Sequence, residues 1–203
     1  MKIICVTRNY KQHALELNNK IPTELIFFLK PETAIPIKGQ PFFIPDFSNE
    51  IHYELEVVIK INKTGKHIQE RFAHKYFDEL SLGIDFTARD LQSKLKKMSF
   101  PWEMSKSFDG SAPIGFFVKK QEFKDINNLN FELTVNNDIK QSGNTKNMIF
   151  SFNHIISYVS KYITLKKGDL IFTGTPKGVG KVRKNDFLIG KIEGKQIIQI
   201  KIK

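Results

Sequence analysis

The stretch HYELEVVI (residues 52–59) places two glutamates, Glu54 and Glu56, inside an otherwise apolar run. Val, Ile, Leu and Tyr favour β-structure, so the run predicts a half-buried strand. Side chains two residues apart on a strand point to the same face of the sheet. The two carboxylates are therefore expected side by side, where their repulsion destabilises the strand unless something compensates for it.

Two explanations of this glutamate pair are open. Carboxylate oxygens bind hard divalent ions such as Mg²⁺, Mn²⁺ or Ca²⁺, and such an ion would cancel the repulsion. Asp85 ends the apolar run LSLGID just before a predicted helix, and it is the best candidate for a third oxygen ligand. Alternatively, the two glutamates form surface salt bridges with lysines.

The composition predicts one globular domain over residues 1–203, with 40% hydrophobic and 26% charged residues. No run of 18 apolar residues occurs, so no membrane span is expected. The opening stretch MKIICVTRNYKQHALE turns polar after six residues and is not expected to act as a signal peptide. The single cysteine, Cys5, has no internal disulfide partner, which favours a cytoplasmic setting.

The formal net charge of +11 raises the question of nucleic acid or an anionic membrane as a partner. The basic residues are scattered, and the C-terminal stretch QIIQIKIK is expected to be a strand with lysines on its solvent face. No basic stripe interleaved with aromatic residues is present. We therefore expect neither a nucleic acid nor a membrane partner, while the basic surface would attract a small anionic substrate.

The pattern along the chain predicts an α+β fold with a largely β core. Strands are expected at residues 3–7, 24–31, 52–61, 80–87 and 196–203, with a hairpin at 130–144 and a strand followed by a glycine turn within residues 164–180. Helices are expected at residues 10–18, 68–80, 88–98 and 149–163. Loops are expected at residues 34–45, with short edge strands, and at residues 99–115. The second loop is long for a compact domain, which is typical of a functional segment.

The stretch RNYKQHALEL (residues 8–17) contains His13 and Glu16, which lie on one face of a helix at this spacing. A carboxylate that holds a histidine makes it a general base. The alternative is an exposed polar helix face.

The stretch GTPKGVGK (residues 174–181) differs from a phosphate-binding loop in its glycine spacing and in Val182 after the lysine. It predicts a tight glycine turn beside a small-molecule site, with Thr173 and Thr175 as donors. The alternative is a plain turn at the end of a strand.

Lys106 lies among small residues in the stretch EMSKSFDGSAPIG. It is either a buried cation that binds an anion or a solvated lysine. No G-x-S-x-G motif and no recognisable Cys–His pair occur, so covalent catalysis has no support.

Six stretches, taken in order, resemble the fumarylacetoacetate hydrolase family, specifically its small single-domain members. They are RNYKQHALEL, IFFLKPETAI, IHYELEVVIKINKTGKHI, GIDFTARDLQ, FPWEMSKSFDGSAPIG and GDLIFTGTPKGVG. The resemblance implies the mixed β-sandwich roll of that family's C-terminal domain, a homodimer, and a site for Mg²⁺ or Mn²⁺.

The resemblance also implies the site residues. It places the metal ligands at Glu54, Glu56 and Asp85, and an active-site lysine at Lys106 whose charge offsets theirs. The residues expected to contact the substrate are Arg8, Tyr10, Lys30, Arg89, Gln92 and Thr175. His13 and Glu16 match the family's His–Glu dyad, carried on a mobile element that closes over the substrate.

The family's substrates are 2-oxo acids, which chelate a metal through their carboxylate and keto oxygens. The resemblance therefore implies a hydrolase that cleaves a C–C bond in acylpyruvates, with water activated by the dyad. Oxaloacetate decarboxylation, or keto–enol tautomerisation or isomerisation of a related dicarboxylate, is the alternative on the same metal site. Nucleic acid binding is a third possibility that rests on charge alone.

Overall fold

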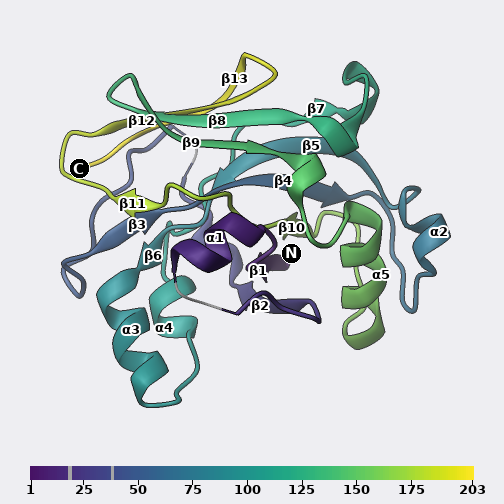
Figure 1. The fold of residues 1–203 in the computed structure, drawn as a ribbon, viewed down its shortest axis with the longest axis horizontal. Helices are drawn as coiled ribbons and strands as arrows, with labels where there is room; N and C mark the ends of the chain where they lie inside the picture. Colours follow the sequence, from purple (N-terminus) through teal and green to yellow (C-terminus); the bar gives the residue numbers. More distant parts are fainter. Residues whose placement is uncertain (18–19, 38) are drawn as a thin grey trace.

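The computed structural model describes residues 1–17, 20–37 and 39–203. A six-stranded mixed sheet, in the order β2-β1-β10-β4-β5-β7, forms its centre (Figure 1). Its strands are β1 (Ile3–Thr7), β2 (Ile26–Lys30), β4 (Leu55–Ile61), β5 (Phe77–Ile84), β7 (Val118–Lys119) and β10 (Leu170–Phe172). Within this sheet β1 and β10 pair in parallel, and the other neighbours pair antiparallel.

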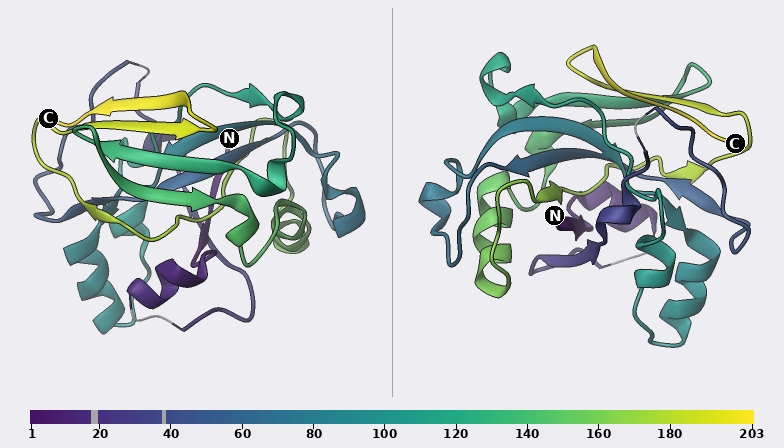
Figure 2. Two further views of the ribbon diagram at one scale, coloured as in Figure 1. Left: turned by 45° about the horizontal axis from the view of Figure 1, so that its top comes forward. Right: turned by 180° about the vertical axis from the view of Figure 1, so that it is seen from behind.

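An antiparallel four-stranded sheet lies over β4 and β5 (Figures 1 and 2). It consists of β8 (Asn130–Val135), β9 (Asp138–Asn144), β12 (Phe187–Ile192) and β13 (Lys195–Lys201). The two layers approach closely at Gly190, where a Cβ atom would lie 3.1 Å from side-chain atoms of both Leu55 and Leu82. Asn136 and Asn137 join β8 to β9 with φ angles of 52° and 74°, the conformation that a tight hairpin turn requires.

A small third sheet continues two strands of the central sheet. It has the order β11-β3-β6, with β3 (Ile51–Tyr53), β6 (Thr87–Ala88) and β11 (Gly180–Lys181). Glu54 separates β3 from β4, and Asp85 and Phe86 separate β5 from β6. The acidic residues therefore lie where the chain passes from one sheet to the other.

Five α-helices occur in the described part of the chain, α1 (Lys11–Glu16), α2 (Glu70–Ala73), α3 (Arg89–Lys97), α4 (Glu103–Lys106) and α5 (Phe152–Tyr162). α5 packs beside α2, whereas α3 and α4 lie together at the opposite end, next to β6 (Figures 1 and 2). Across the described ranges, no helix has the length and apolarity needed to cross a membrane.

The predicted α+β class with a β core is confirmed, but the boundaries of several elements differ. The helix predicted over residues 68–80 is wrong, because α2 ends at Ala73 and β5 begins at Phe77. Phe77 pairs with Ile61 of β4 and packs on Phe152, so sheet pairing and burial outweigh helical spacing. The loop predicted over residues 99–115 contains the single turn of α4.

Two other predicted segments are described only in part. Residue 18 of the helix at 10–18, and residue 38 of the loop at 34–45, lie outside the described residues. In that loop Phe42 forms one isolated parallel bridge with Ile202.

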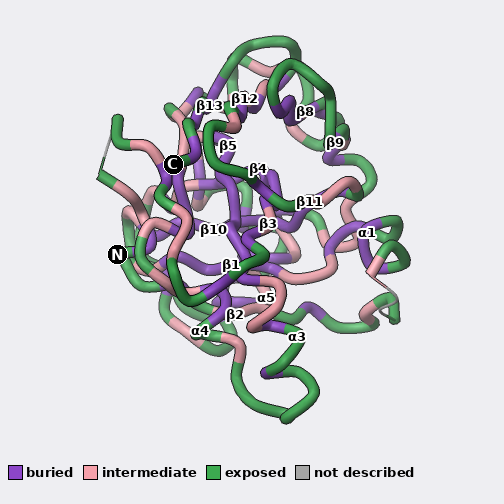
Figure 3. The backbone as a smooth tube through the Cα atoms, turned by 90° about the vertical axis from the view of Figure 1, so that its left-hand side faces the viewer, coloured by how far each residue is buried: buried purple, intermediate pink, exposed green. Residues whose placement is uncertain are grey.

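The expectation of a half-buried strand at HYELEVVI is also wrong, because β4 is buried on both faces. Val57 and Ile59 belong to the main hydrophobic core, whereas Val58 belongs to a second core with Cys5 and Phe172. Figure 3 shows the buried residues along the central strands and the exposed ones along the outer turns. Glu56 therefore stands on a strand that has no solvent face, where an uncompensated charge is costly.

Candidate active site

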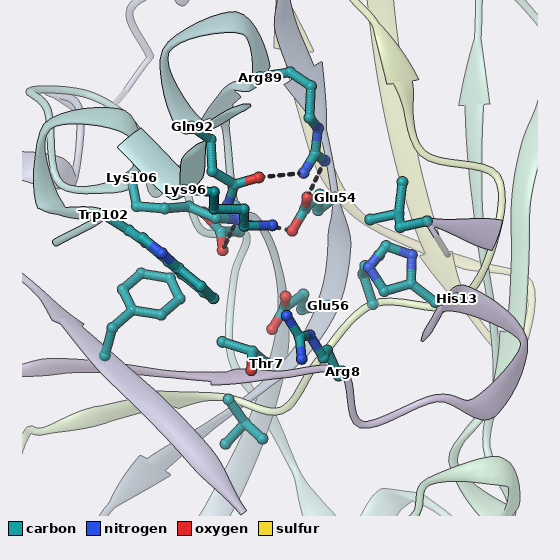
Figure 4. Close-up of a pocket in the computed structure, with 15 residues that line it drawn as sticks. Thr7, Arg8, His13, Glu54, Glu56, Arg89, Gln92, Lys96, Trp102 and Lys106 are labelled. Carbon is teal, nitrogen blue, oxygen red and sulfur yellow. Dashed lines mark hydrogen bonds and ion pairs between the residues drawn. The ribbon is translucent and has the colours of Figure 1, made fainter. Parts of the chain in front are cut away.

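A cavity of about 40 Å³ opens where β4, β5, α1, α3 and α4 meet (Figure 4). Nine of the thirteen residues that the sequence nominated line it: Arg8, His13, Glu54, Glu56, Asp85, Arg89, Gln92, Lys106 and Thr175. The other four, Tyr10, Glu16, Lys30 and Thr173, are not part of the lining. The structure thus gathers residues from five separate segments around one small space.

The three acidic residues converge in this cavity. One carboxylate oxygen from each of Glu54, Glu56 and Asp85 lies within 4.8 Å of the other two. β4 and β5 pair antiparallel with Leu55 opposite Ile84, and the amide of Asp85 donates a 2.8 Å hydrogen bond to the carbonyl of Glu54. The sheet register therefore fixes all three carboxylates near each other. Glu54 and Glu56 are only 6% and 2% exposed, so the explanation as surface salt bridges is wrong.

Two cations compensate Glu54. Lys106 Nζ lies 2.8 Å from Glu54 Oε2 and 2.8 Å from Asp85 Oδ2, and the Arg89 guanidinium donates to Glu54 Oε1. Burial alone would raise the pKa of the Glu54 carboxyl, but Lys106 and Arg89 outweigh it and hold that pKa well below its usual range. Lys106 is 3% exposed, so it is a buried cation and not a solvated lysine.

Glu56 has no such compensation. In the ranges 1–17, 20–37 and 39–203, no lysine or arginine forms an ion pair with Glu56, whose Oε2 accepts a 2.7 Å hydrogen bond from the Gly174 amide. Burial raises the pKa of Glu56 well above its ordinary value, and Asp85 and Glu54 raise it further. A divalent ion among the three carboxylates would supply the missing positive charge, and carboxylate oxygens are ligands that Mg²⁺ and Mn²⁺ prefer. The residues present therefore fit a metal ion.

Lys30 lies behind Asp85 and outside the cavity lining. Its Nζ atom is 2.8 Å from Asp85 Oδ1, and it also donates to the carbonyl of Lys106 and to the carbonyl and hydroxyl of Ser111. Its side chain is fully buried. In this position Lys30 orients Asp85 and the chain around Lys106, and does not face the space where a substrate would lie.

The peptide between the two glutamates is held by side chains from other elements. The Leu55 amide donates to Gln141 Oε1 at 2.9 Å, and the Thr175 hydroxyl donates to the Leu55 carbonyl at 2.8 Å. Gln141 Nε2 in turn donates to the Thr175 hydroxyl at 2.8 Å. The Thr175 hydroxyl is therefore already engaged. Thr173 does not line the cavity, because its hydroxyl donates to the Val57 carbonyl.

α1 brings the predicted dyad to the cavity. His13 is 5% exposed, and its Nδ1 lies 3.4 Å from Glu16 Oε2, so an exposed polar helix face is not what forms. Burial lowers the pKa of His13 and outweighs the opposing effects of Glu54 and Glu16. Glu16 also accepts hydrogen bonds of 3.0 and 3.2 Å from the Gly178 amide. The same carboxylate thus orients His13 and fastens α1 to the glycine turn.

The segment before α1 is anchored on one side and strained on the other. Asn9 is fully buried, and its amide bonds to the backbone of Phe150 and Thr173. Arg8 lines the cavity and has a φ angle of 56°, a conformation that is unfavourable for arginine and recurs at functional sites. Tyr10 packs edge-on against Phe131 and turns away from the cavity lining, so it contacts the core.

Lys96 and Trp102 are among the six lining residues that the sequence analysis did not nominate. Lys96 follows Arg89 and Gln92 at spacings that place all three on one face of α3, a signal that was readable from ARDLQSKLKK. Trp102 precedes α4 and, with Thr7 and Phe28, lines both this cavity and a neighbouring one of about 240 Å³. No local pattern marks a residue that two cavities share.

Comparison with known proteins agrees with this geometry. The family model for the fumarylacetoacetate hydrolase C-terminal domain matches residues 2–200. The chain is 43% identical to the oxaloacetate tautomerase FAHD1 of Mus musculus over 201 residues, 99% of this chain and 91% of that protein. It is 47% identical over 183 residues to a mitochondrial oxaloacetate decarboxylase of Dictyostelium discoideum, covering 90% of this chain and 84% of that protein.

A solved structure of a fumarylpyruvate hydrolase has the same fold as this chain. The fumarylpyruvate hydrolase of Pseudomonas aeruginosa, in complex with Mn²⁺ and pyruvate, superposes with a TM-score of 0.93 at 33% identity. The match covers all of this chain and 89% of the other. The resemblance found in the sequence and the expected fold type are thereby confirmed. The chain belongs to the fumarylacetoacetate hydrolase family of enzymes.

Proposed function

We propose that this protein is a divalent-metal-dependent tautomerase that interconverts the enol and keto forms of oxaloacetate. The sequence analysis placed acylpyruvate hydrolysis first and this reaction among the alternatives. The similarity to oxaloacetate tautomerases, together with the cations that line the cavity, favours reversing that order.

The charge of the cavity carries the proposal. The cavity lies beside the acidic triad, and Thr7, Phe28 and Trp102 line both it and the neighbouring cavity. Among the described residues, two of its cations, Arg8 and Lys96, form no ion pair. A compact dianion suits this space better than an acylpyruvate with a long neutral tail. Oxaloacetate has four carbons and two carboxylates.

Mg²⁺ or Mn²⁺ would be held by Glu54, Glu56 and Asp85. When bound, the ion would act as a Lewis acid that stabilises negative charge on the oxo oxygen of the substrate. Gln92 accepts a 2.7 Å hydrogen bond from Arg89 through Oε1, which leaves its amide nitrogen available to the substrate. Because the Thr175 hydroxyl already donates to the Leu55 carbonyl, we assign any contact of Thr175 with the substrate to its backbone.

His13 is the group that moves the proton. Its lowered pKa keeps the imidazole neutral at neutral pH, so it can accept the proton of the enol hydroxyl. Glu16 stabilises the imidazolium that results. The His13 imidazolium then transfers this proton to C3 of the substrate. This step forms the keto tautomer and returns the imidazole to its neutral state, so no atom is gained or lost.

Acylpyruvate hydrolysis is a second candidate on the same residues. The His13–Glu16 pair supports it, because the same base could activate a water molecule, and so does the similarity to a fumarylpyruvate hydrolase. Oxaloacetate decarboxylation would need the metal site and a closed lid but no activated water. The cytoplasmic setting and the homodimer expected from the sequence stay predictions.

The test mixes purified protein with the enol form of oxaloacetate, in one assay with Mg²⁺ and in another with EDTA. The loss of enol absorbance is followed over time. Pyruvate formation and acetylpyruvate loss are measured in parallel. We expect enol loss that EDTA abolishes, no pyruvate beyond the spontaneous rate, and a loss of rate of about 10²-fold or more in His13→Ala.

His154→Ala is the matched control, because His154 also contacts a glutamate, Glu70, at 3.2 Å, but on the surface. Full activity in His13→Ala would remove His13 from the mechanism. EDTA-sensitive acetylpyruvate cleavage that exceeds enol loss would establish the hydrolase instead.

A further inference from the structure

Lys96 is a cation in the lining of the cavity that does not contact the acidic triad. Lys106 and Arg89 both contact Glu54, so their charges are compensated within the protein. The side-chain ammonium of Lys96 forms neither an ion pair nor a hydrogen bond with any described residue, whereas its backbone carbonyl accepts from the Ser99 amide, and Lys96 lines the same cavity. A positive charge that faces a binding cavity without a protein partner is available to an anionic ligand.

The place of Lys96 is set by a rigid element. Arg89, Gln92 and Lys96 occupy positions i, i+3 and i+7 of α3, and all three line the cavity (Figure 4). At 1.5 Å per residue, Lys96 lies about 10 Å further along the helix axis than Arg89. Because Arg89 reaches Glu54, the row runs from the acidic triad to the far part of the cavity.

Trp102 provides a platform for this lysine. Lys96 Nζ lies 4.9 Å from the centroid of the Trp102 ring, a cation–π contact that restricts the flexible side chain. Trp102 itself lines the cavity and precedes α4, which bears Lys106. The ammonium group is therefore held at the cavity wall before any ligand arrives, which reduces the entropy lost on binding.

The charges around Lys96 favour the binding of an anionic group beside it. Lys96 is an exposed residue, and the partial burial of its side chain lowers its pKa, which the charges of Arg89 and Arg8 lower further. A carboxylate placed beside Lys96 would be attracted by all of these charges, and it would relieve their mutual repulsion.

We propose that Lys96, held on Trp102, binds the distal carboxylate of a dicarboxylic 2-oxo acid whose oxo-acid end faces the acidic triad. This assignment rests on the proposed function and names the residue that selects its substrate class. It makes Lys96 a specificity-determining residue, which distinguishes a four-carbon dicarboxylate from a monocarboxylic 2-oxo acid such as pyruvate.

The test compares binding of L-malate and L-lactate in the presence of Mg²⁺, since these 2-hydroxy acids differ by the distal carboxylate. Trp102 is the single tryptophan of the chain, so its fluorescence reports binding directly. Lys96→Met keeps the aliphatic stem on the ring but removes the charge. Lys97→Met is the matched control, because Lys97 is on the same helix and is exposed like Lys96, but does not line the cavity.

We expect the wild type and Lys97→Met to bind malate about tenfold more tightly than lactate, and Lys96→Met to bind both equally, as the loss of one charge-assisted hydrogen bond implies. Lys96→Arg should retain the preference. The KM for oxaloacetate should rise by a similar factor in Lys96→Met while kcat changes little.

Equal behaviour of Lys96→Met and Lys97→Met would overturn the proposal, as would loss of the malate preference in Arg8→Met alone. Failure of the proposed function is a separate result. A wild type that does not turn over oxaloacetate, but prefers malate through Lys96, would reject the tautomerase and keep the carboxylate site.

Discussion

Lys106 places its ammonium nitrogen 2.8 Å from Asp85 Oδ2, and the same atom lies 2.8 Å from Glu54 Oε2. Burial lowers the pKa of this lysine, but Asp85 and Glu54 outweigh burial and raise it, so the group stays charged. A divalent ion that binds the triad must therefore share these oxygens with a fixed positive charge. We therefore expect Lys106 both to stabilise the metal-free protein and to limit how tightly the ion binds.

Lys106→Met is expected to bind Mg²⁺ more tightly than the wild type, by about tenfold or more, because a competing charge is removed from a poorly screened site. Isothermal titration of Mg²⁺ into EDTA-treated protein measures this. Lys119→Met is the control, since Lys119 pairs with Glu79 at the surface. Weaker binding in Lys106→Met would mean that the ammonium is needed to assemble the oxygen ligands.

Lys30→Met should destabilise the metal-free protein by about 3–5 kcal/mol, the range for removing one partner of a buried ion pair. The change removes the cation at Asp85 Oδ1 and at the hydrogen-bond acceptors of Ser111, and leaves Asp85 only its contact with Lys106 through Oδ2. Urea unfolding in EDTA gives the free energy of unfolding. Lys119→Met, whose ammonium is solvated, should leave the midpoint unchanged. If the two variants unfold alike, Lys30 has no structural role in the acidic site.

Trp102→Ala should widen the range of substrates. The truncation joins the small cavity to the neighbouring one of about 240 Å³ and removes the platform of Lys96. Both effects should lower kcat/KM for oxaloacetate relative to kcat/KM for acylpyruvates with longer acyl groups. We expect the ratio of these two kcat/KM values to fall at least tenfold in Trp102→Ala.

Phe100→Ala is the control for Trp102→Ala, because Phe100 is an exposed aromatic residue of the same segment that does not line either cavity. The ratio of kcat/KM values for oxaloacetate and for an acylpyruvate with an acyl group longer than acetyl checks the prediction. An unchanged ratio would show that Trp102 does not limit the size of the substrate.

The acidic triad was predictable from the sequence because its signals are local. Glu54 and Glu56 interrupt an apolar run at the spacing of one strand face, and Asp85 follows another such run. Lys30 was expected to touch the substrate and instead supports Asp85, since neither its burial nor its partner at Ser111 can be read from IFFLKPETAI. Long-range packing, not local pattern, decided its position.

The same distinction explains the wrong helix at residues 68–80. Its apolar positions fit a helix, but Phe77 is paired in the sheet with Ile61, a contact that only the tertiary structure specifies. Lys96 is the converse case, because its spacing from Arg89 and Gln92 on α3 could have nominated it, once that helix face was known to line the site.

The pH dependence of kcat/KM tests the dyad. The proton acceptor must be neutral, so the rate falls as pH decreases through the pKa of His13 in the free enzyme. Burial lowers that pKa from the ordinary value of 6.5, and a metal ion that cancels the charge of Glu54 would lower it further. We therefore expect the acidic limb of the profile to have its midpoint below pH 6.5.

Glu16→Gln should move this midpoint to still lower pH, because the Glu16 carboxylate raises the pKa of His13 through its hydrogen bond and its charge. The maximal rate should fall at the same time, since an amide does not stabilise the imidazolium. Glu70→Gln, which alters the surface pair with His154, should leave the profile unchanged. A midpoint that rises in Glu16→Gln would show that the limb belongs to another group, and it would separate His13 from the proton transfer.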